Sequence, residues 1–256
     1  MIDLHCHILP GIDDGPETIE GSVALAAAAA EGGTRTIVAT PHVSWEWQNA
    51  AASIAVGVRA VNDALREAAI PVDVLAGAEV ALSRAADLHP AELTALRLGG
   101  GPWLLVECPL TLAAPAFEQG LDALQRQGHR IVLAHPERCP ALQRDPERLA
   151  ALVRREMVTS LTASAFTGGF GRTVRRFAFE LLRRGLVHEI ASDAHDAVRR
   201  PPALVAALEA VGLGEYAAQL TQEAPDAILR GSTLPAALVV TPRGGLRPRL
   251  FGRGRA

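Results

Sequence analysis

The sequence predicts a single-domain α/β barrel, in which parallel strands are joined by crossover helices. Short strand-like runs alternate with longer helix-like segments, an alternation typical of parallel βαβ units. His, Asp or Glu residues also follow nearly every strand-like run, and the carboxyl ends of barrel strands are where active sites collect. An open doubly wound sheet is the alternative, but its ligands would gather at one switch point. The distribution therefore favours a barrel of about seven strand–helix units.

The predicted strands are short apolar runs of four to six residues. In chain order they cover residues 2–5, 34–39, 72–76, 103–107, 130–134, 158–161 and 187–191. The predicted helices lie between them and cover residues 16–31, 50–69, 115–127, 146–154, 171–184 and 202–211. Gly32, Gly128 and Gly185 stand where three of these helices should end in a left-handed cap.

Length and composition suit a globular protein with a buried core, because the 256 residues are 49% hydrophobic and 21% charged. No apolar run is long enough to predict a transmembrane segment, and an acidic, His-containing start does not resemble a signal peptide. A net charge of −3 argues against general nucleic-acid binding. The odd count of three cysteines argues against a disulfide framework. We therefore expect a cytoplasmic protein with reduced thiols and leave its oligomeric state open.

The chain opens with a strand that ends in two histidines, His5 and His7. Side chains at positions i and i+2 of a strand share one face, so both imidazoles can bind the same cation. Further candidate ligands follow later strands, in the segments Thr40-Pro41-His42, Gly77-Ala78-Glu79, Val106-Glu107-Cys108, Ala134-His135-Pro136 and Ser192-Asp193-Ala194-His195. Mixed nitrogen and oxygen donors favour Mn, Fe or Zn, and a centre of two or three such ions suits phosphoester hydrolysis.

These motifs together resemble the polymerase-and-histidinol-phosphatase (PHP) superfamily of metal-dependent phosphoesterases. The opening Ile-Asp-Leu-His-Cys-His-Ile-Leu-Pro-Gly-Ile-Asp-Asp-Gly-Pro is similar to that of the bacterial manganese-dependent protein-tyrosine phosphatases of capsule and exopolysaccharide operons. The resemblance runs from residue 1 to about residue 200. It implies a PHP-type distorted (β/α)7 barrel, which we expect over residues 1–240. Residues 241–256 form an Arg-rich tail that we expect to be disordered.

The resemblance also implies a ligand set for Mn2+, with Fe or Zn as alternatives. One ion is held by His5, His7 and Asp193, and a second by Glu107 and His135, with Glu79 bridging the two. A third is held by Asp14, His42 and His195. Asp13 beside Asp14 is kept as a residue that supports a ligand. Arg138 and Arg200 match the family's phosphate clamp, a role that suits the planar guanidinium because it can take two phosphate oxygens at once.

The surface that receives the substrate departs from the family pattern. Cys139 stands where an aromatic residue often follows the clamp arginine, and the segment from Leu161 to Ser164 lacks the family's asparagine. Among the few aromatic residues, Trp45, Trp47 and Phe166 are predicted to line the rim of the site.

The implied function is hydrolysis of phosphotyrosine on a protein, with a membrane-associated polysaccharide-assembly tyrosine kinase as the expected partner. One alternative is a phosphoesterase that acts on nucleic-acid ends or on a small phosphomonoester such as histidinol phosphate. Another is a regulatory protein that binds phosphorylated chains without turnover. A cysteine phosphatase is excluded, because none of Cys6, Cys108 and Cys139 is followed by an arginine in a C-x5-R motif.

Overall fold

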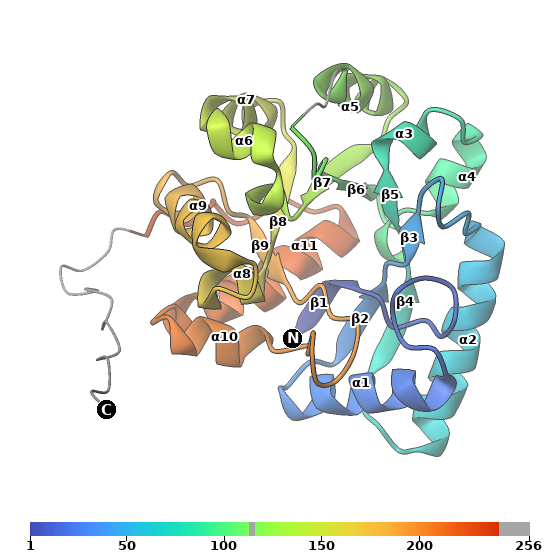
Figure 1. Ribbon diagram of the computed structural model, residues 1–256. Helices are drawn as coiled ribbons and strands as arrows, with labels where there is room; N and C mark the ends of the chain where they lie inside the picture. The colour runs from blue at the N-terminus through green and yellow to red at the C-terminus, as the bar shows by residue number, and fades with distance from the viewer. Residues whose placement is uncertain (113–115, 241–256) are drawn as a thin grey trace, which may run out of the picture.

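The computed structural model describes residues 1–112 and 116–240, and their strands form parallel sheets surrounded by helices (Figure 1). One sheet has the order β1-β2-β4 and the other the order β3-β5-β6-β7-β8-β9. The strands are β1 (Ile2–Cys6), β2 (Thr36–Ala39), β3 (His42–Val43), β4 (Asp73–Ala76), β5 (Glu79–Ala81), β6 (Trp103–Glu107), β7 (Arg130–Ala134), β8 (Val158–Thr162) and β9 (Glu189–Ala191).

The chain passes from one sheet to the other at two places: β2 leads into β3, and β4 leads into β5. Strands β2 and β3 are separated by Thr40 and Pro41, and β4 and β5 by Gly77 and Ala78. Pro41 cannot donate to a ladder, and a Cβ on Gly77 would lie 2.7 Å from a side-chain carbon of Val38. The short strands β3 and β5 were not predicted, because these breaks interrupt the apolar runs.

The last strand returns to the first, as a barrel requires. Cys6 and Ala194 form an isolated parallel bridge, and the backbone N–H of Asp193 donates to the carbonyl of His5 over 2.8 Å. A second bond joins the N–H of His7 to the carbonyl of Ala194 over 2.9 Å. This seam consists of isolated bonds and not of a regular ladder. The α/β prediction with parallel strands is therefore confirmed, and no continuous ladder closes the described strands into a barrel.

Helices cover the outer face of the strands (Figure 1). Six of them, α1, α2, α5, α7, α9 and α10, match the predicted helices to within three residues, although the predicted start at residue 115 lies outside the described residues. The short helices α3, α4, α6, α8 and α11 were not predicted. The α-helices are α1 (Ile19–Glu31), α2 (Ala51–Glu67), α3 (Leu82–Ala85), α4 (Pro90–Ala95), α5 (Phe117–Arg126), α6 (Pro140–Arg144), α7 (Pro146–Arg154), α8 (Ala163–Thr167), α9 (Gly171–Arg183), α10 (Leu204–Ala210) and α11 (Ala224–Arg230).

Single-turn helices complete the chain: the 3-10 helices η1 (Leu98–Gly100), η2 (Pro136–Arg138) and η3 (Gly214–Tyr216), and the π-helix η4 (Gln219–Glu223). The predicted left-handed caps occur at Gly128 and Gly185, with φ of 83° and 67°. After the first helix, Gly33 and not Gly32 takes this conformation, with φ of 91°.

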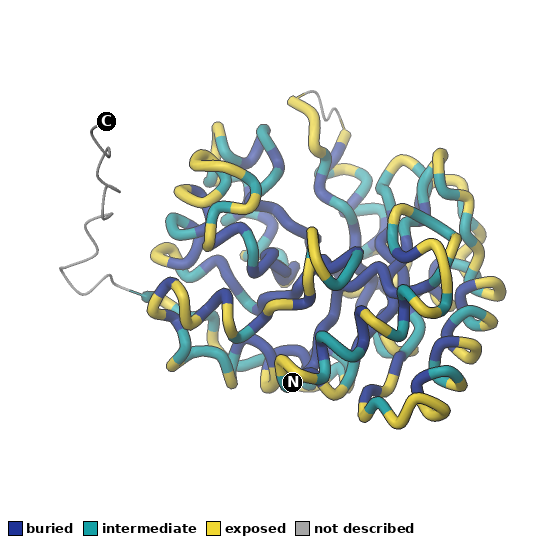
Figure 2. Tube along the Cα trace, turned by 60° about the horizontal axis from the view of Figure 1, so that its bottom comes forward, coloured by how far each residue is buried: buried dark blue, intermediate teal, exposed yellow. Residues whose placement is uncertain are grey.

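Apolar side chains pack on both faces of the strands. Leu104 and Val106 of β6 join the larger core between strands and helices, whereas Trp103 and Leu105 join a second, smaller cluster. Ile228 of α11 also packs in the smaller cluster. Figure 2 shows the buried strands at the centre and the exposed residues on the outer helices and loops. This packing holds the strand ends, and the polar residues on them, in fixed positions.

The predictions about transmembrane segments and cysteines can be compared with the described residues. No described helix has the length and apolar character needed to cross a bilayer. Cys6, Cys108 and Cys139 are buried free thiols. The predicted tail, residues 241–256, lies outside the described residues.

Candidate metal centre

All nine predicted ligands lie close together: eight stand at or just after the carboxyl ends of β1, β2, β4, β6, β7 and β9, and Asp14 stands in the loop that follows β1. They fall into four groups of His, Asp and Glu whose ligand atoms are within 4.8 Å of one another. Glu79 belongs to two of the groups and therefore connects them. The groups are His5, His7 and Asp193; His5, Glu79 and His135; His42, Glu79 and Glu107; and His7, Asp14, His42 and His195.

The innermost donors surround one point. Nε2 of His5 lies 3.2 Å from Nε2 of His7, and 3.3 Å and 3.6 Å from oxygens of Glu79 and Asp193. Nε2 of His7 lies 3.5 Å and 3.6 Å from the same two oxygens. Donor atoms about 2.1 Å from a shared cation are roughly 3.0–3.5 Å apart in octahedral or tetrahedral geometry. The four side chains therefore fit a bound divalent ion.

Glu79 joins donors from three further strands. Its Oε1 lies 2.7 Å from Nε2 of His135, and its Oε2 lies 3.1 Å from Nδ1 of His42. His42 and Glu79 are paired residues of β3 and β5, so backbone register brings these two side chains together. Glu107 groups with His42 and Glu79, whereas the resemblance paired it with His135. The carboxylate of Glu79, whose two oxygens face different histidines, can give one oxygen to each of two ions.

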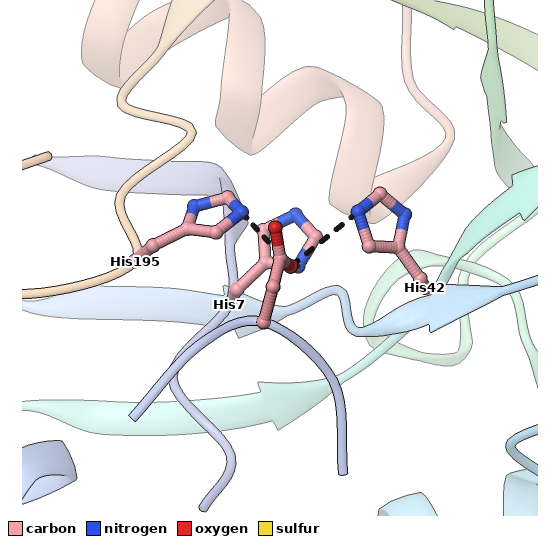
Figure 3. Close-up of side chains that lie close together, drawn as sticks. His7, His42 and His195 are labelled. Atoms are coloured by element: carbon pink, nitrogen blue, oxygen red, sulfur yellow. Dashed lines mark ion pairs between the residues drawn. The ribbon is translucent and has the colours of Figure 1, made fainter. Parts of the chain in front are cut away.

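The outer group is the most open. Oδ1 of Asp14 lies 3.2 Å from Nε2 of His195 and 3.6 Å from Nε2 of His42, and the Asp14 side chain is 48% exposed. Figure 3 shows the rings of His7, His42 and His195 gathered at this side of the centre. The His7 ring centroid lies 3.9 Å from that of His195 and 4.5 Å from that of His42. A cavity of about 670 Å³ adjoins this group, with Asp14, His195 and Arg200 in its lining.

Asp13 supports the ligands instead of joining them. Its Oδ2 lies 2.7 Å from Nδ1 of His7, on the opposite side of the ring from the shared point. The same oxygen accepts from the backbone N–H of His42, and Oδ1 accepts from the N–H of Gly15. A carboxylate on the far nitrogen of a histidine fixes its tautomer and orientation. The predicted supporting role of Asp13 agrees with this geometry.

The two predicted clamp arginines converge on one atom. Nη1 of Arg138 and Nη2 of Arg200 donate to Oδ2 of Asp193, over 3.0 Å and 2.8 Å. The other oxygen of Asp193 faces His5 and His7. Both guanidinium groups therefore lie beside the innermost donors, where they can meet an anion bound there.

An aromatic residue that sequence reasoning missed holds one of these arginines. The guanidinium of Arg138 lies over the ring of Phe170, which follows α8 and is only partly buried. Phe170 stands between two glycines, so no periodic signal marked it. The predicted rim residue Phe166 is instead fully buried in the core, and that prediction is wrong. Trp45 is 56% exposed and Trp47 is half-buried.

The backbone is strained at two candidate ligands. His135 and Asp193 have φ of 35° and 52°, values that non-glycine residues rarely adopt. His135 directly follows β7, and Asp193 lies two residues after the end of β9. Backbone hydrogen bonds hold both residues in place, including the bond from the N–H of His135 to the carbonyl of Ser160. Strain of this kind concentrates at functional sites.

Electrostatics keep the central carboxylates charged. Burial opposes ionisation of Asp193, but His5, His135 and Arg200 lower its pKa to about 2. Burial is likewise outweighed at Glu79, where His5 and His135 hold the pKa well below its usual range. The same balance raises the pKa of His7 to about 10, since Asp13 and Glu79 outweigh its burial. Anionic oxygens beside imidazoles are the donor set that a divalent cation favours.

Three more buried carboxyl groups lie outside the four groups. Oδ1 of Asp3 accepts from the N–H of Ser192, and Oε1 of Glu137 accepts from the N–H of Thr162. Neither oxygen of Glu189 has a hydrogen bond of good geometry. Burial, together with the charges of Asp3 and Glu137, raises the pKa of Glu189 to about 8. This carboxyl is therefore held mainly in its neutral form at pH 7.

The chain matches the protein family described as "Capsular polysaccharide synthesis, CpsB/CapC" over residues 1–230. It is 34% identical over 201 residues to the tyrosine-protein phosphatase YwqE of Bacillus subtilis, covering 78% of this chain and 79% of YwqE. It is 29% identical over 231 residues to the tyrosine-protein phosphatase CpsB of Streptococcus pneumoniae, covering 87% of this chain and 94% of CpsB.

The fold is similar as well. A structure from a study of YwqE and CpsB, described there as unique metal-dependent tyrosine phosphatases, superposes with a TM-score of 0.82 and 32% identity. The match covers 94% of this chain and all of the other. Sequence and fold both match over most of the chain, and the chain belongs to the CpsB/CapC family of capsular polysaccharide synthesis proteins.

Proposed function

We propose that this protein is a metal-dependent phosphatase that hydrolyses phosphotyrosine on a protein. The observation that carries the proposal is the set of five donor separations of 3.2–3.6 Å among His5, His7, Glu79 and Asp193. Two arginines that can bind phosphate adjoin this set. Relatives named tyrosine-protein phosphatases support the substrate class.

We assign the ions to the residues as follows. His5, His7 and Asp193 would hold one ion, Glu107 and His135 would hold a second, and Glu79 would be shared between these two sites. Asp14, His42 and His195 would hold a third. Nitrogen and oxygen donors without thiolate accept Mn2+, Fe2+ or Zn2+, and we propose Mn2+. When bound, such ions make a nucleophile available from water near neutral pH and neutralise charge on the phosphoryl group.

The side chains of the protein bind and orient the substrate. Arg138 and Arg200 take the phosphoryl oxygens and neutralise the charge that develops in the transition state. The phenolic oxygen of tyrosine has a free pKa of about 10, so it leaves readily and needs no strong general acid. Asp193 accepts hydrogen bonds from both arginines and faces His5 and His7, and so holds the arginines beside the innermost donors.

The partner we propose is a membrane-associated tyrosine kinase of polysaccharide assembly, reached from the cytoplasm. The description of the family as one of capsular polysaccharide synthesis supports this choice. The net charge of −3 supports a protein substrate over nucleic acid.

The test compares hydrolysis of a phosphotyrosine peptide, a phosphoserine peptide and histidinol phosphate, after chelation and after adding back Mn2+, Fe2+ or Zn2+. We expect activity to return with Mn2+ and to favour phosphotyrosine strongly. Restored activity that favours histidinol phosphate would keep the centre and overturn the substrate. Tight binding of the phosphotyrosine peptide with no turnover under any metal would instead make the protein a regulatory binder.

A further inference from the structure

Trp45 stands at the tip of a closed turn directly after β3. Val43 and Gln48 form an isolated antiparallel bridge, and the N–H of Ser44 donates to the carbonyl of Trp47 over 2.9 Å. The hydroxyl of Ser44 accepts from the N–H groups of Trp47 and Glu46, over 3.0 Å and 3.2 Å. These bonds order the turn, so it presents the large side chain at its tip in a defined place.

Arg84 of α3 braces the indole ring. Its guanidinium carbon lies 5.0 Å from the ring centroid, within the range of a cation–π contact. Its Nε is buried without a hydrogen-bond partner among the described residues. Trp45 nevertheless remains 56% exposed. A tryptophan that is ordered, braced and still mostly exposed is typical of a contact surface.

This surface adjoins the metal centre. Trp45 is three residues from His42, so their Cα atoms are at most ~11 Å apart. Of the six large hydrophobic side chains exposed in the described residues, four follow strand ends on the same side: Trp45 after β3, Leu110 and Leu112 after β6, and Val198 after β9. The exposed apolar side chains are therefore concentrated around the carboxyl ends of the strands, which form the mouth of the site, as at a binding surface.

The substrate geometry selects the occupant. A phosphate that reaches the innermost donors brings its ester group, and any chain attached to it, out across the mouth. A small phosphoester ends there, whereas a phosphotyrosine carries the polypeptide on both sides of it over the surrounding loops. A polypeptide substrate can therefore use the apolar side chains around the site for affinity more fully than a small phosphoester.

We propose that Trp45, braced by Arg84, contacts the polypeptide that flanks the phosphotyrosine and makes the enzyme prefer phosphorylated protein over small phosphoesters. The inference rests on the proposed function, because it concerns the substrate of that site. Trp45 is the substrate-contacting residue, and Arg84 is a positioning residue that holds the indole.

The test measures the ratio of kcat/KM for a phosphotyrosine peptide to kcat/KM for p-nitrophenyl phosphate, with Mn2+ present. Trp45→Ala should lower this ratio about tenfold through a higher peptide KM, and Trp45→Phe should restore most of it. Arg84→Met should lower it in the same direction by a smaller factor. Val56→Ala is the matched control, because Val56 is 57% exposed on α2, away from the strand ends, and should leave the ratio unchanged.

Two outcomes would overturn the inference. An equal loss on both substrates would mean that Trp45 supports the metal centre through β3. An unchanged ratio would remove Trp45 from substrate contact, and a change from dimer to monomer alongside it would assign the surface to a second copy of this chain. If the unmutated protein hydrolyses neither substrate with any metal, the proposed function fails first, and peptide binding by Trp45→Ala then tests the contact on its own.

Discussion

The guanidinium carbon of Arg138 lies 4.4 Å from the ring centroid of Phe170. Through its Nη1, the same guanidinium donates to Oδ2 of Asp193. The arginine is therefore held between an aromatic face and a carboxylate, and its orientation is set before any substrate binds. Such preorganisation lowers the cost of binding a phosphate.

Phe170→Leu should weaken the inhibition by inorganic phosphate and raise the substrate KM, each by about three- to tenfold, because the cation–π contact contributes ~1 kcal/mol. Phe170→Tyr should restore most of both. Phe179→Leu is the control, since Phe179 lies under Arg175 on the same helix but away from the centre. Equal effects of the two leucine variants would show that only helix packing had been disturbed.

Glu79→Gln should lower turnover by at least about a hundredfold. An amide has one neutral oxygen that can bind a metal, whereas the Glu79 carboxylate offers two charged oxygens to the two ligand groups that share it. The metal content after gel filtration should fall by at least one ion per chain, measured by elemental analysis. Glu67→Gln, at an exposed position near the end of α2, should change neither quantity. Full activity in Glu79→Gln would contradict the assignment of Glu79 as a shared ligand.

Asp13→Asn should weaken metal binding by about 10–100-fold while the ligands themselves stay in place, because it removes the charge that orients His7. Titration calorimetry with Mn2+ would measure this as a change in affinity with little change in stoichiometry. Asp14→Asn offers the comparison, since it should lose the outer ion and so reduce the number of ions bound. The same stoichiometry loss in both variants would make Asp13 a ligand.

Glu189 should make the protein less stable as the pH rises. Burial raises its pKa to about 8 from an ordinary 4.5, so the folded state keeps a proton that the unfolded state has lost. Below about pH 4.5 both states are protonated and the group has no effect, and between pH 4.5 and 8 the free energy of unfolding falls with pH. The total loss is at most about 5 kcal/mol.

Glu189→Gln removes this titration, so its stability advantage over the parent should grow between pH 5 and pH 8 and then level off. Urea unfolding of the chelated proteins at several pH values measures the difference, in which the titrating groups that do not interact with Glu189 cancel. A constant difference across that range would show that Glu189 ionises normally in the folded state.

Much of the centre could be predicted from the sequence because every ligand except Asp14 stands in or shortly after a recognisable strand. His5 lies in β1 and His7 directly follows it, and His135 and Asp193 follow apolar runs directly or within two residues, so the parallel arrangement alone brings them to one edge. Resemblance was needed for Asp14, which lies in a loop and could not be separated from Asp13 by pattern.

Other features depend on tertiary packing that one sequence does not display. The short strands β3 and β5 follow a proline and a Gly-Ala pair, so no periodicity announces them. Phe166 was expected at the rim and lies in the core, because a five-residue helix does not show from its sequence which side faces inward. The contact between Phe170 and Arg138 joins residues that no local pattern connects.

The seam between the first and last strands has a consequence for how the protein is made. Its backbone bond joins His5 to Asp193, and the candidate ligands span residues 5 to 195. On the ribosome, His5 and His7 emerge first, whereas Asp193 and His195 follow only when β9 has been synthesised. The complete ligand set therefore exists only when most of the chain has been made, so we expect the full centre to assemble late in the protein's biogenesis and to take its ions from the compartment in which the finished chain folds.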